Sequence, residues 1–262
     1  MSEPASLRTR PRGALADRAL RLRALHRDGP LLVLPSVWDA ASAQAAVAAG
    51  FPAVATASAA IAAAIGRPDQ EGLGVHQMLD AVERIAAAVD VPVTADLESG
   101  YGLDPAALVD GLLDVGAVGL NLEDSDHAGG GRLRGADEQQ RLLAAVRAAA
   151  DASGIPVVLN ARCDLLLRRD GDPATRLART IGRLEGYAAA GADVLYPIGA
   201  RDPDDLRTLA TALPRPVNAL ADPGDDLAAL AATGVRRVTF GPYLQRATMD
   251  AMAGLLGRWR PS

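Results

Sequence analysis

The feature that most constrains the fold is a regular alternation of short apolar segments with alanine-rich segments along the whole chain. The short segments are apolar throughout rather than at every second position, which is typical of strands covered on both faces. They are predicted as strands at Leu31–Pro35, Ala53–Ala57, Val91–Ala95, Val118–Leu122, Val157–Ala161, Val194–Pro197, Val217–Leu220 and Arg237–Phe240.

The segments between these strands carry the start and stop signals of helices. Several begin at Asp-Pro or Asp-Asp pairs, where aspartate caps the first turn and proline fits it. Many end at a glycine that allows the left-handed turn back into a sheet, as at Gly50, Gly116, Gly191 and Gly234. The predicted helices are Ala40–Ala49, His76–Val89, Pro105–Val115, Glu138–Ala152, Pro173–Ala190, Pro203–Ala212 and Asp225–Ala232.

Strands that each lead into a helix predict a parallel α/β fold, either a (β/α)8 TIM-type barrel or a doubly wound open sheet. The count of eight, and the lack of a Gly-x-Gly-x-x-Gly turn after the first strand, favour the barrel. No change of composition marks a second domain. We therefore expect one domain over 1–262, with an N-terminal helical extension (1–30), the barrel (31–241) and a C-terminal helix (242–262).

The residue types present exclude several kinds of chemistry. All 27 basic residues are arginine, so the chain has no lysine for a Schiff base, for pyridoxal phosphate or for a Walker A loop. The single cysteine, Cys163, excludes multi-cysteine metal sites, and we expect it to be a buried structural residue. The remaining inventory of carboxylates, arginines and hydroxyls favours a hard, oxygen-liganded metal.

Charge and hydropathy indicate a protein that acts on small molecules. The formal net charge of −5 argues against nucleic-acid and membrane-surface partners. No uncharged apolar run reaches the roughly 18 residues that a membrane span needs. The arginine-rich stretch Leu7–Arg27 lacks the apolar region of a signal peptide, so we expect a cytoplasmic protein.

The ends of three neighbouring predicted strands carry the residues best suited to chemistry. Asp96 and Glu98 follow the third strand, Glu123 follows the fourth and Arg162 follows the fifth. Because strand ends meet at one mouth of a barrel, three carboxylates there would repel one another unless a cation such as Mg²⁺ lay among them. The alternative is that each carboxylate caps the helix that follows it. For the neighbouring Asp124, local capping and a role in the site are equally good interpretations.

Four segments in this order carry a resemblance to a known family. They are Val37–Ala43, Asp96-Leu-Glu-Ser-Gly-Tyr-Gly102, Asn121-Leu-Glu-Asp124 and Asn160-Ala-Arg-Cys-Asp164. The chain resembles the isocitrate lyase/phosphoenolpyruvate mutase superfamily from about Leu31 to Phe240. The resemblance implies a (β/α)8 barrel, usually a homotetramer whose last helix is exchanged between subunits. It also implies Mg²⁺ or Mn²⁺ and a 2-oxo acid or enolpyruvyl substrate that reacts through a pyruvate-enolate-like species.

Site residues follow from the same resemblance. Asp96, Glu98, Glu123 and Asp69 match the acidic residues around the metal, although the family commonly has aspartate where Glu98 stands. Arg162 matches a substrate-binding arginine. Further candidates for substrate contacts are Ser58 and Ala59, whose turn would hold a carboxylate or phosphonate, the Gly100-Tyr101 turn, and Trp38, for which packing is the alternative. Asp39 is expected to cap a helix.

The chain departs from the family in the loop that closes the site. Isocitrate and methylisocitrate lyases carry Lys-Lys-Cys-Gly-His there, and mutases carry a lysine. Residues 125–135 read Ser-Asp-His-Ala-Gly-Gly-Gly-Arg-Leu-Arg-Gly, with neither lysine nor cysteine. His127 is the candidate general acid or base, with an exposed loop histidine as the alternative. Arg132 and Arg134 are the other polar candidates, whereas His26 and His76 are assigned no chemistry.

The resulting prediction is a Mg²⁺-dependent carbon–carbon lyase or decarboxylase acting on a small 2-oxo or 2-hydroxy dicarboxylate. Cleavage of isocitrate and methylisocitrate is disfavoured by the altered loop. One alternative is phosphonopyruvate-type mutase or hydrolase chemistry at a P–C bond. The other is a barrel that binds an organic acid without turnover.

Overall fold

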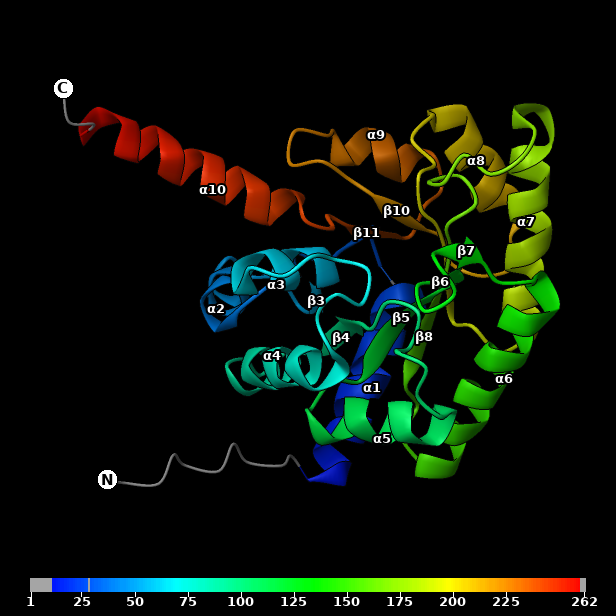
Figure 1. The fold of residues 1–262 in the computed structure, drawn as a ribbon, viewed down its shortest axis with the longest axis horizontal. Helices are drawn as coiled ribbons and strands as arrows, with labels where there is room; N and C mark the ends of the chain where they lie inside the picture. The colour runs from blue at the N-terminus through cyan, green and yellow to red at the C-terminus, as the bar shows by residue number, and fades with distance from the viewer. Residues whose placement is uncertain (1–10, 28, 260–262) are drawn as a thin grey trace.

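The computed structural model describes residues 11–27 and 29–259, which form an α/β fold (Figure 1). The parts of the predicted terminal segments at 1–10, 28 and 260–262 lie outside the described residues. The elements in chain order are α1 (Arg12–Arg27), β1 (Leu32–Val33), β2 (Ser36–Val37), α2 (Ala40–Ala48), β3 (Val54–Thr56), α3 (Ser58–Ile65), α4 (Val75–Ala87), β4 (Val93–Asp96), α5 (Pro105–Asp114), β5 (Gly119–Glu123), β6 (Ser125–Asp126), β7 (Arg132–Leu133), α6 (Ala136–Ser153), β8 (Val158–Cys163), α7 (Pro173–Ala189), β9 (Val194–Pro197), α8 (Pro203–Ala212), β10 (Asn218–Leu220), α9 (Leu227–Ala232), β11 (Arg237–Thr239), α10 (Tyr243–Leu256) and η1 (Gly257–Trp259).

The strands follow the order of the predicted TIM-type barrel. They form two parallel sheets, β2-β3-β4-β5-β8-β9 and β1-β11-β10. The sheets adjoin where β1 runs into β2: the amide of Leu34 donates to the Val238 carbonyl (2.9 Å), and that of Ala55 donates to the Pro35 carbonyl (3.0 Å). They adjoin again where Leu195 in β9 forms a bridge with the residue that precedes β10. The predicted α/β class and barrel order are therefore confirmed.

The first predicted strand, Leu31–Pro35, is wrong in its bounds. The structure has two short strands, β1 and β2, on either side of Leu34 and Pro35. Pro35 has no amide hydrogen to donate to a ladder, so the strand is interrupted there. β1 pairs with β11 and β2 pairs with β3, which lets this one segment contact both sheets.

Helix α3 was not among the predicted helices, because Ser58 and Ala59 were expected to form a turn. The structure places Ser58 at the start of α3, which is built mostly of alanine, the strongest helix former. Gly66 ends it with a left-handed φ of +73°. Although α3 is apolar, neither it nor any other helix of residues 11–27 and 29–259 has the length and hydropathy needed to cross a bilayer.

The predicted helix signals are confirmed elsewhere. Gly50, Gly116, Gly191 and Gly234 all have positive φ and return the chain to the sheet. The side chains of aspartates at the starts of α5, α7, α8 and α9 accept hydrogen bonds from amides of the first turn. Asp39 caps α2 in the same way, as predicted.

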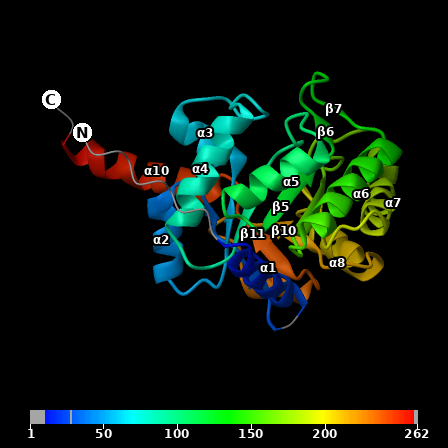
Figure 2. The same cartoon turned by 90° about the horizontal axis from the view of Figure 1, so that it is seen from below.

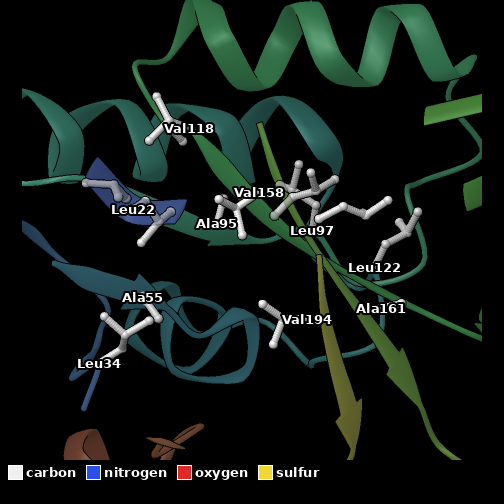
Figure 3. Packing of buried hydrophobic residues seen from close by; sticks show 14 of the residues in the cluster. Leu22, Leu34, Ala55, Ala95, Leu97, Val118, Leu122, Val158, Ala161 and Val194 are labelled. Carbon is white, nitrogen blue, oxygen red and sulfur yellow. The ribbon is translucent and has the colours of Figure 1, made fainter. Parts of the chain in front are cut away.

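Helix α1 lies across the N-terminal ends of the strands, seen from below in Figure 2. Leu22 of α1 is fully buried, and a Cβ atom at Gly119, the first residue of β5, would lie 3.0 Å from its Cδ2 atom. Figure 3 shows Leu22 beside core residues that the successive strands contribute. Helix α1 therefore covers the N-terminal ends of the strands with apolar side chains, and the polar side chains lie at the C-terminal ends.

Helix α10 extends away from the rest of the structure in both views (Figures 1 and 2). It carries a row of exposed apolar side chains at helical spacing, continued into η1: Met249, Met252, Leu256 and Trp259. These side chains form an apolar surface that the described part of the chain leaves exposed.

Candidate active site

Strand register gathers the predicted residues at the C-terminal end of the parallel strands. Asp96 ends β4 and pairs in register with Asn121 of β5. Two residues further along β5, Glu123 pairs with Arg162 of β8. The adjacent order β4-β5-β8 therefore brings Asp96, Glu123 and Arg162 to one edge of the sheet, where the site was predicted.

Asp96 has one carboxylate oxygen held and one without a partner. Its Oδ2 accepts hydrogen bonds from the Ser58 amide (3.2 Å) and hydroxyl (2.9 Å) at the start of α3. Its Oδ1 is buried and has no hydrogen-bond partner among the described residues. A buried carboxylate oxygen that lacks a donor is costly, so this atom is suited to accept a ligand.

Glu98 lies two residues beyond the end of β4, with a left-handed φ of +49°. It accepts hydrogen bonds from the Tyr101 hydroxyl (2.7 Å) and from the Glu71 amide. Burial raises the pKa of Glu98 to about 7, and the negative charges of Asp96 and Asp69 act in the same direction. Glu98 therefore sits where a nearby positive charge would stabilise its ionised form.

Glu123 lies between two cationic side chains. Its Oε2 forms an ion pair with Arg162 Nη1 (2.5 Å), and its Oε1 contacts His127 Nε2 (2.6 Å). Burial raises the pKa of Glu123 to about 8, although the charge of Arg162 opposes this. Arg162 also binds Asp164 through two nitrogens, Nε to Oδ1 (2.6 Å) and Nη2 to Oδ2 (3.0 Å), so its guanidinium is fixed in orientation.

His127 is buried against the site rather than exposed on the loop, with only 7% of its side chain accessible. Besides Glu123, its Nε2 lies 4.0 Å from Glu98 Oε2. Burial alone would lower the pKa of His127, but the hydrogen bond to Glu123 and the surrounding carboxylates raise it. The alternative of an exposed loop histidine is therefore wrong, and the imidazole lies beside the cavity in contact with Glu123.

The loop that carries His127 is a short antiparallel hairpin formed by β6 and β7. Its glycines form the turn, where the amide of Gly129 donates to Asp126 Oδ1 (2.9 Å). Arg132 pairs with Asp126 (2.9 Å) and is more than half exposed. Arg134 donates to the carbonyls of Ser99 (3.1 Å) and Glu123 (3.4 Å), beneath the acidic residues. Both arginines thus hold the loop, and neither lines a cavity beside Glu123 or Asp96.

Two adjoining cavities occupy this end of the barrel and share Ser58, Asp69, Arg162 and Leu167. One has a volume of about 190 Å³ and lies beneath the hairpin, against Glu98, Glu123 and His127. The other has a volume of about 230 Å³ and reaches Asp96, Asn121 and Tyr196. Their combined size suits a small dicarboxylate and not a large cofactor.

The predicted substrate-binding residues divide into two groups. Ser58 and Ala59 line the larger of the two cavities. Trp38 packs against the core, and Gly100 and Tyr101 direct their amides to Leu97 and Glu71, so none of these three lines either cavity. Tyr101 instead positions Glu98, and substrate contact by these three residues stays a prediction.

Asp69 and two further carboxylates complete the site. Asp69 lines both cavities, and partial burial of its carboxyl group, together with the charge of Asp96, raises its pKa. Sequence reasoning gave no role to Asp164, which holds Arg162, or to Glu71, whose carboxylate accepts from Ser99 and Tyr101. Asp164 is the last residue of the segment Asn160–Asp164, so the sequence offered a signal for it. No feature near Glu71 in the sequence indicated that this residue lies at the site.

Two neighbouring residues prove to be structural. Asp124 is buried and joins β5 to β8 and α7, because it accepts from the Asp164 amide (2.8 Å), the Tyr187 hydroxyl (2.8 Å) and Arg183 (3.1 Å). It does not cap a helix. Cys163 points into the hydrophobic core, on the opposite side of β8 from Arg162, and is confirmed as a buried residue.

The carboxylates of the site are ligands of the type that a divalent cation prefers, although they do not surround a single metal position. Among the described residues, no group of three or more histidine, cysteine, aspartate or glutamate side chains is arranged around one metal position. However, the buried Oδ1 of Asp96 lacks a hydrogen-bond partner among the described residues, and Asp69 and Glu98 line the adjoining cavities as further oxygen donors. Oxygen ligands supplemented by water are the arrangement that Mg²⁺ prefers.

Comparison with known proteins identifies the family of the chain. The family described as phosphoenolpyruvate phosphomutase matches residues 22–258. A candidate phosphonomutase from Burkholderia cenocepacia J2315 has a solved structure with a TM-score of 0.86 and 41% identity, covering 92% of this chain and 99% of that one.

Two further relatives carry named activities. An oxaloacetate decarboxylase of Rhodopseudomonas palustris (strain BisB5) is 30% identical over 94% of this chain and 86% of its own length. A structure of oxaloacetate acetylhydrolase with the product oxalate has a TM-score of 0.82 and 27% identity, over 93% of this chain and 86% of that one. Together with the family match over most of its length, these likenesses show that the protein is a member of the phosphoenolpyruvate mutase/isocitrate lyase superfamily.

Proposed function

We propose that the protein is a Mg²⁺-dependent lyase that releases pyruvate from a small 2-oxo or 2-hydroxy dicarboxylate, with decarboxylation of oxaloacetate as the leading reaction. The observation that carries the proposal is the arrangement around Glu123, where a fixed arginine and a largely buried histidine face the same small cavity. The likeness to oxaloacetate decarboxylases supports the choice of substrate.

The residues of the chain bind and orient the substrate. Arg162 lines both cavities and, because Asp164 fixes its plane, presents a positive charge to a substrate carboxylate. Ser58 lies at the N-terminal end of α3, where helix amides favour an anion. Arg162 binds one carboxylate of a short dicarboxylate, and Ser58, whose amide and hydroxyl donate to Asp96, lines the shared part of the cavities.

The implied metal has a defined place in this scheme. Asp96, through its free Oδ1, would hold the ion together with Glu98, Glu123 and Asp69, in part through water. When bound, the divalent cation stabilises negative charge that develops on the 2-oxo oxygen.

Proton supply falls to the hairpin. Loss of carbon dioxide from oxaloacetate breaks the bond between C3 and its carboxyl carbon and leaves the electron pair in the enolate of pyruvate. One proton at C3 then completes pyruvate. His127 is the one histidine among the described residues that line the smaller cavity, and its contact with Glu123 raises its pKa, which favours a role as proton donor. The hairpin thereby takes over the task of the missing lysine and cysteine.

A second candidate is cleavage at a P–C bond, as in phosphonopyruvate chemistry. The structural likeness to a candidate phosphonomutase favours it, since that relative shares 41% identity. The same arginine and serine would hold a phosphonate. The choice between the two reactions is made by the substrate and not by a different set of residues.

We also propose that the protein is a homodimer or homotetramer, in which α10 packs against a neighbouring subunit. The exposed row Met249, Met252, Leu256 and Trp259 supports this, because α10 has few contacts with its own barrel.

Pyruvate release from a panel of oxaloacetate, 2-oxo acids, malates and phosphonopyruvate tests the function. We expect Mg²⁺-dependent release from oxaloacetate and its loss on addition of EDTA, measured by a coupled lactate dehydrogenase assay. Glu123→Gln should lower kcat by at least about 100-fold, because the imidazole and guanidinium lose their shared anion. Glu185→Gln, on the exposed face of α7, is the matched control and should leave kcat unchanged.

Release of pyruvate and phosphate from phosphonopyruvate alone would establish hydrolysis of the P–C bond by water, the hydrolase form of the second candidate. Absence of metal-dependent pyruvate from every compound, or full activity of Glu123→Gln, would contradict the proposal.

Stability of the metal-free protein should fall as pH rises. The pKa of Glu98 is raised from 4.5 to about 7, so the folded state binds its proton more tightly than the unfolded state does. The resulting stabilisation is complete below pH 4.5 and is lost as pH rises through 7. Urea unfolding between pH 5 and 8 should therefore show a fall to which Glu98 contributes on the order of 2 kcal/mol. Glu98→Gln should remove this part and leave the part due to Glu123. An equal slope in this variant would show that Glu98 is not the group responsible.

Sedimentation velocity tests the role of α10. We expect an oligomer for the wild-type chain and a monomer for Met252→Asp/Leu256→Asp, because two charges would interrupt the apolar row. Ala247→Asp, on the opposite side of α10, should remain oligomeric. A monomeric wild-type chain would refute the proposed packing.

A further inference from the structure

A separate cavity of about 490 Å³ lies at the other end of the barrel, where α1 crosses the N-terminal ends of the strands. It is bounded by α1, by α6 and β8, and by the segments that precede β9 and β10. None of its lining residues belongs to the two cavities of the candidate active site. It therefore needs its own explanation.

The cavity is positively charged, although the chain as a whole carries a net charge of −5. Its charged lining consists of four guanidinium groups and two carboxylates, which leaves a formal excess of two positive charges: Arg23, Arg27, Arg147, Arg215, Asp151 and Asp193. Guanidinium groups stay ionised at all physiological pH values, so this excess is permanent. Such a concentration of arginine around a hollow favours an oxyanion.

Arg23 and Arg147 are held in place by hydrogen bonds and ion pairs with neighbouring residues. Asp193 pairs with Arg23 (3.0 Å) and, more loosely, with Arg147 (3.7 Å), and it also accepts from the Leu159 amide (2.9 Å). Both arginines also donate to the Val157 carbonyl. Their Nε atoms are buried and lack a partner among the described residues. These two side chains are thus preorganised, with hydrogen-bonding capacity left over.

Backbone geometry makes room for one of them. Gly191 has a φ of +102°, and a Cβ atom there would lie 2.7 Å from Arg147 Cγ. The glycine therefore allows the aliphatic part of Arg147 to lie directly against the main chain. The guanidinium is directed to Val157 and Asp193 at the cavity wall.

The other two arginines are exposed at the rim. Neither Arg27, at the end of α1, nor Arg215, in the segment before β10, has an ion pair or hydrogen bond with another described residue. Their charge is therefore not neutralised by the described part of the chain. Because these two side chains come from separate segments of the cavity lining, they suit a ligand with more than one anionic group.

His26 lines the same cavity but adds no charge to it. Its Nδ1 donates to the Leu22 carbonyl (2.7 Å), which leaves Nε2 to face Arg237 Nη1 at 3.4 Å. Burial, reinforced by the charge of Arg237, lowers the pKa of His26 to about 3. The imidazole is neutral, and the recognition chemistry of the cavity comes from arginine alone.

We propose that this cavity is a second ligand site, which binds a small anion carrying at least two carboxylate or phosphate groups. Arg23 and Arg147 form a fixed inner pair, and Arg27 and Arg215 close on the ligand from the rim. Because the site lies across the barrel from Arg162, it binds its ligand independently of the substrate.

Calorimetric titration of the full chain with pyrophosphate, and separately with citrate, tests the site. The buffer is freed of metal by a chelating resin, since EDTA is itself a polyanion. We expect at least one of the two probes to bind. Arg27→Ser/Arg215→Ser should raise its Kd at least tenfold, because both side chains are exposed at the rim and their removal leaves the fold intact. Binding at the active site does not depend on these residues.

Arg84→Ser/Arg141→Ser is the matched control, since it removes the same charge from exposed positions outside the cavity. We expect it to change Kd less than twofold. Pyrophosphate binding alone would identify a phosphate-bearing ligand, and citrate binding alone a polycarboxylate, and either supports the site. The proposal is overturned if neither probe binds at millimolar concentration, if the rim variant binds as tightly as the wild type, or if both double variants weaken binding equally.

Discussion

The candidate site depends on how one buried carboxylate is compensated. Glu123 is almost inaccessible to solvent, and it is shared between Arg162 on the neighbouring strand and His127 on the hairpin. An uncompensated buried charge would cost several kcal/mol. The ion pair therefore fixes the ends of β5 and β8 relative to each other, and the imidazole fastens the hairpin over the cavity. Asp96 and Glu98 add negative charge beside this centre, which is why the site as a whole favours an additional cation.

The parts of the fold that depend on local signals could be predicted from the sequence. Strand order, helix caps and the convergence of Asp96, Glu123 and Arg162 all follow from apolar runs, turn residues and the geometry of parallel strands. The split of the first strand at Pro35 was not predicted, because it depends on pairing with two different strands. The helix that begins at Ser58 was not predicted either, because Ser58 and Ala59 were expected to form a substrate-binding turn. The role of Glu71 was missed for a different reason: it contacts Ser99 and Tyr101, and no local pattern reports a contact between separate loops.

The lack of lysine shapes both ends of the molecule. At the C-terminal end of the strands, the hairpin without lysine carries His127, and the contact with Glu123 raises the pKa of the imidazole. At the N-terminal end, arginines line the second cavity and give it a charge that does not vary with pH. In both places the position of the cation is fixed by an acidic partner, Glu123 in one and Asp193 in the other.

The central claim is that the acidic cluster at the C-terminal end of the barrel binds a divalent cation through the free oxygen of Asp96. Titration of Mn²⁺ into the protein, followed by the electron paramagnetic resonance signal of the free ion, tests this without reference to turnover. We predict one bound Mn²⁺ per chain, with Kd raised at least tenfold in Asp96→Asn and unchanged in Asp114→Asn, an exposed position at the end of α5. No stoichiometric binding to the wild-type chain, or equal binding to Asp96→Asn, would contradict the account.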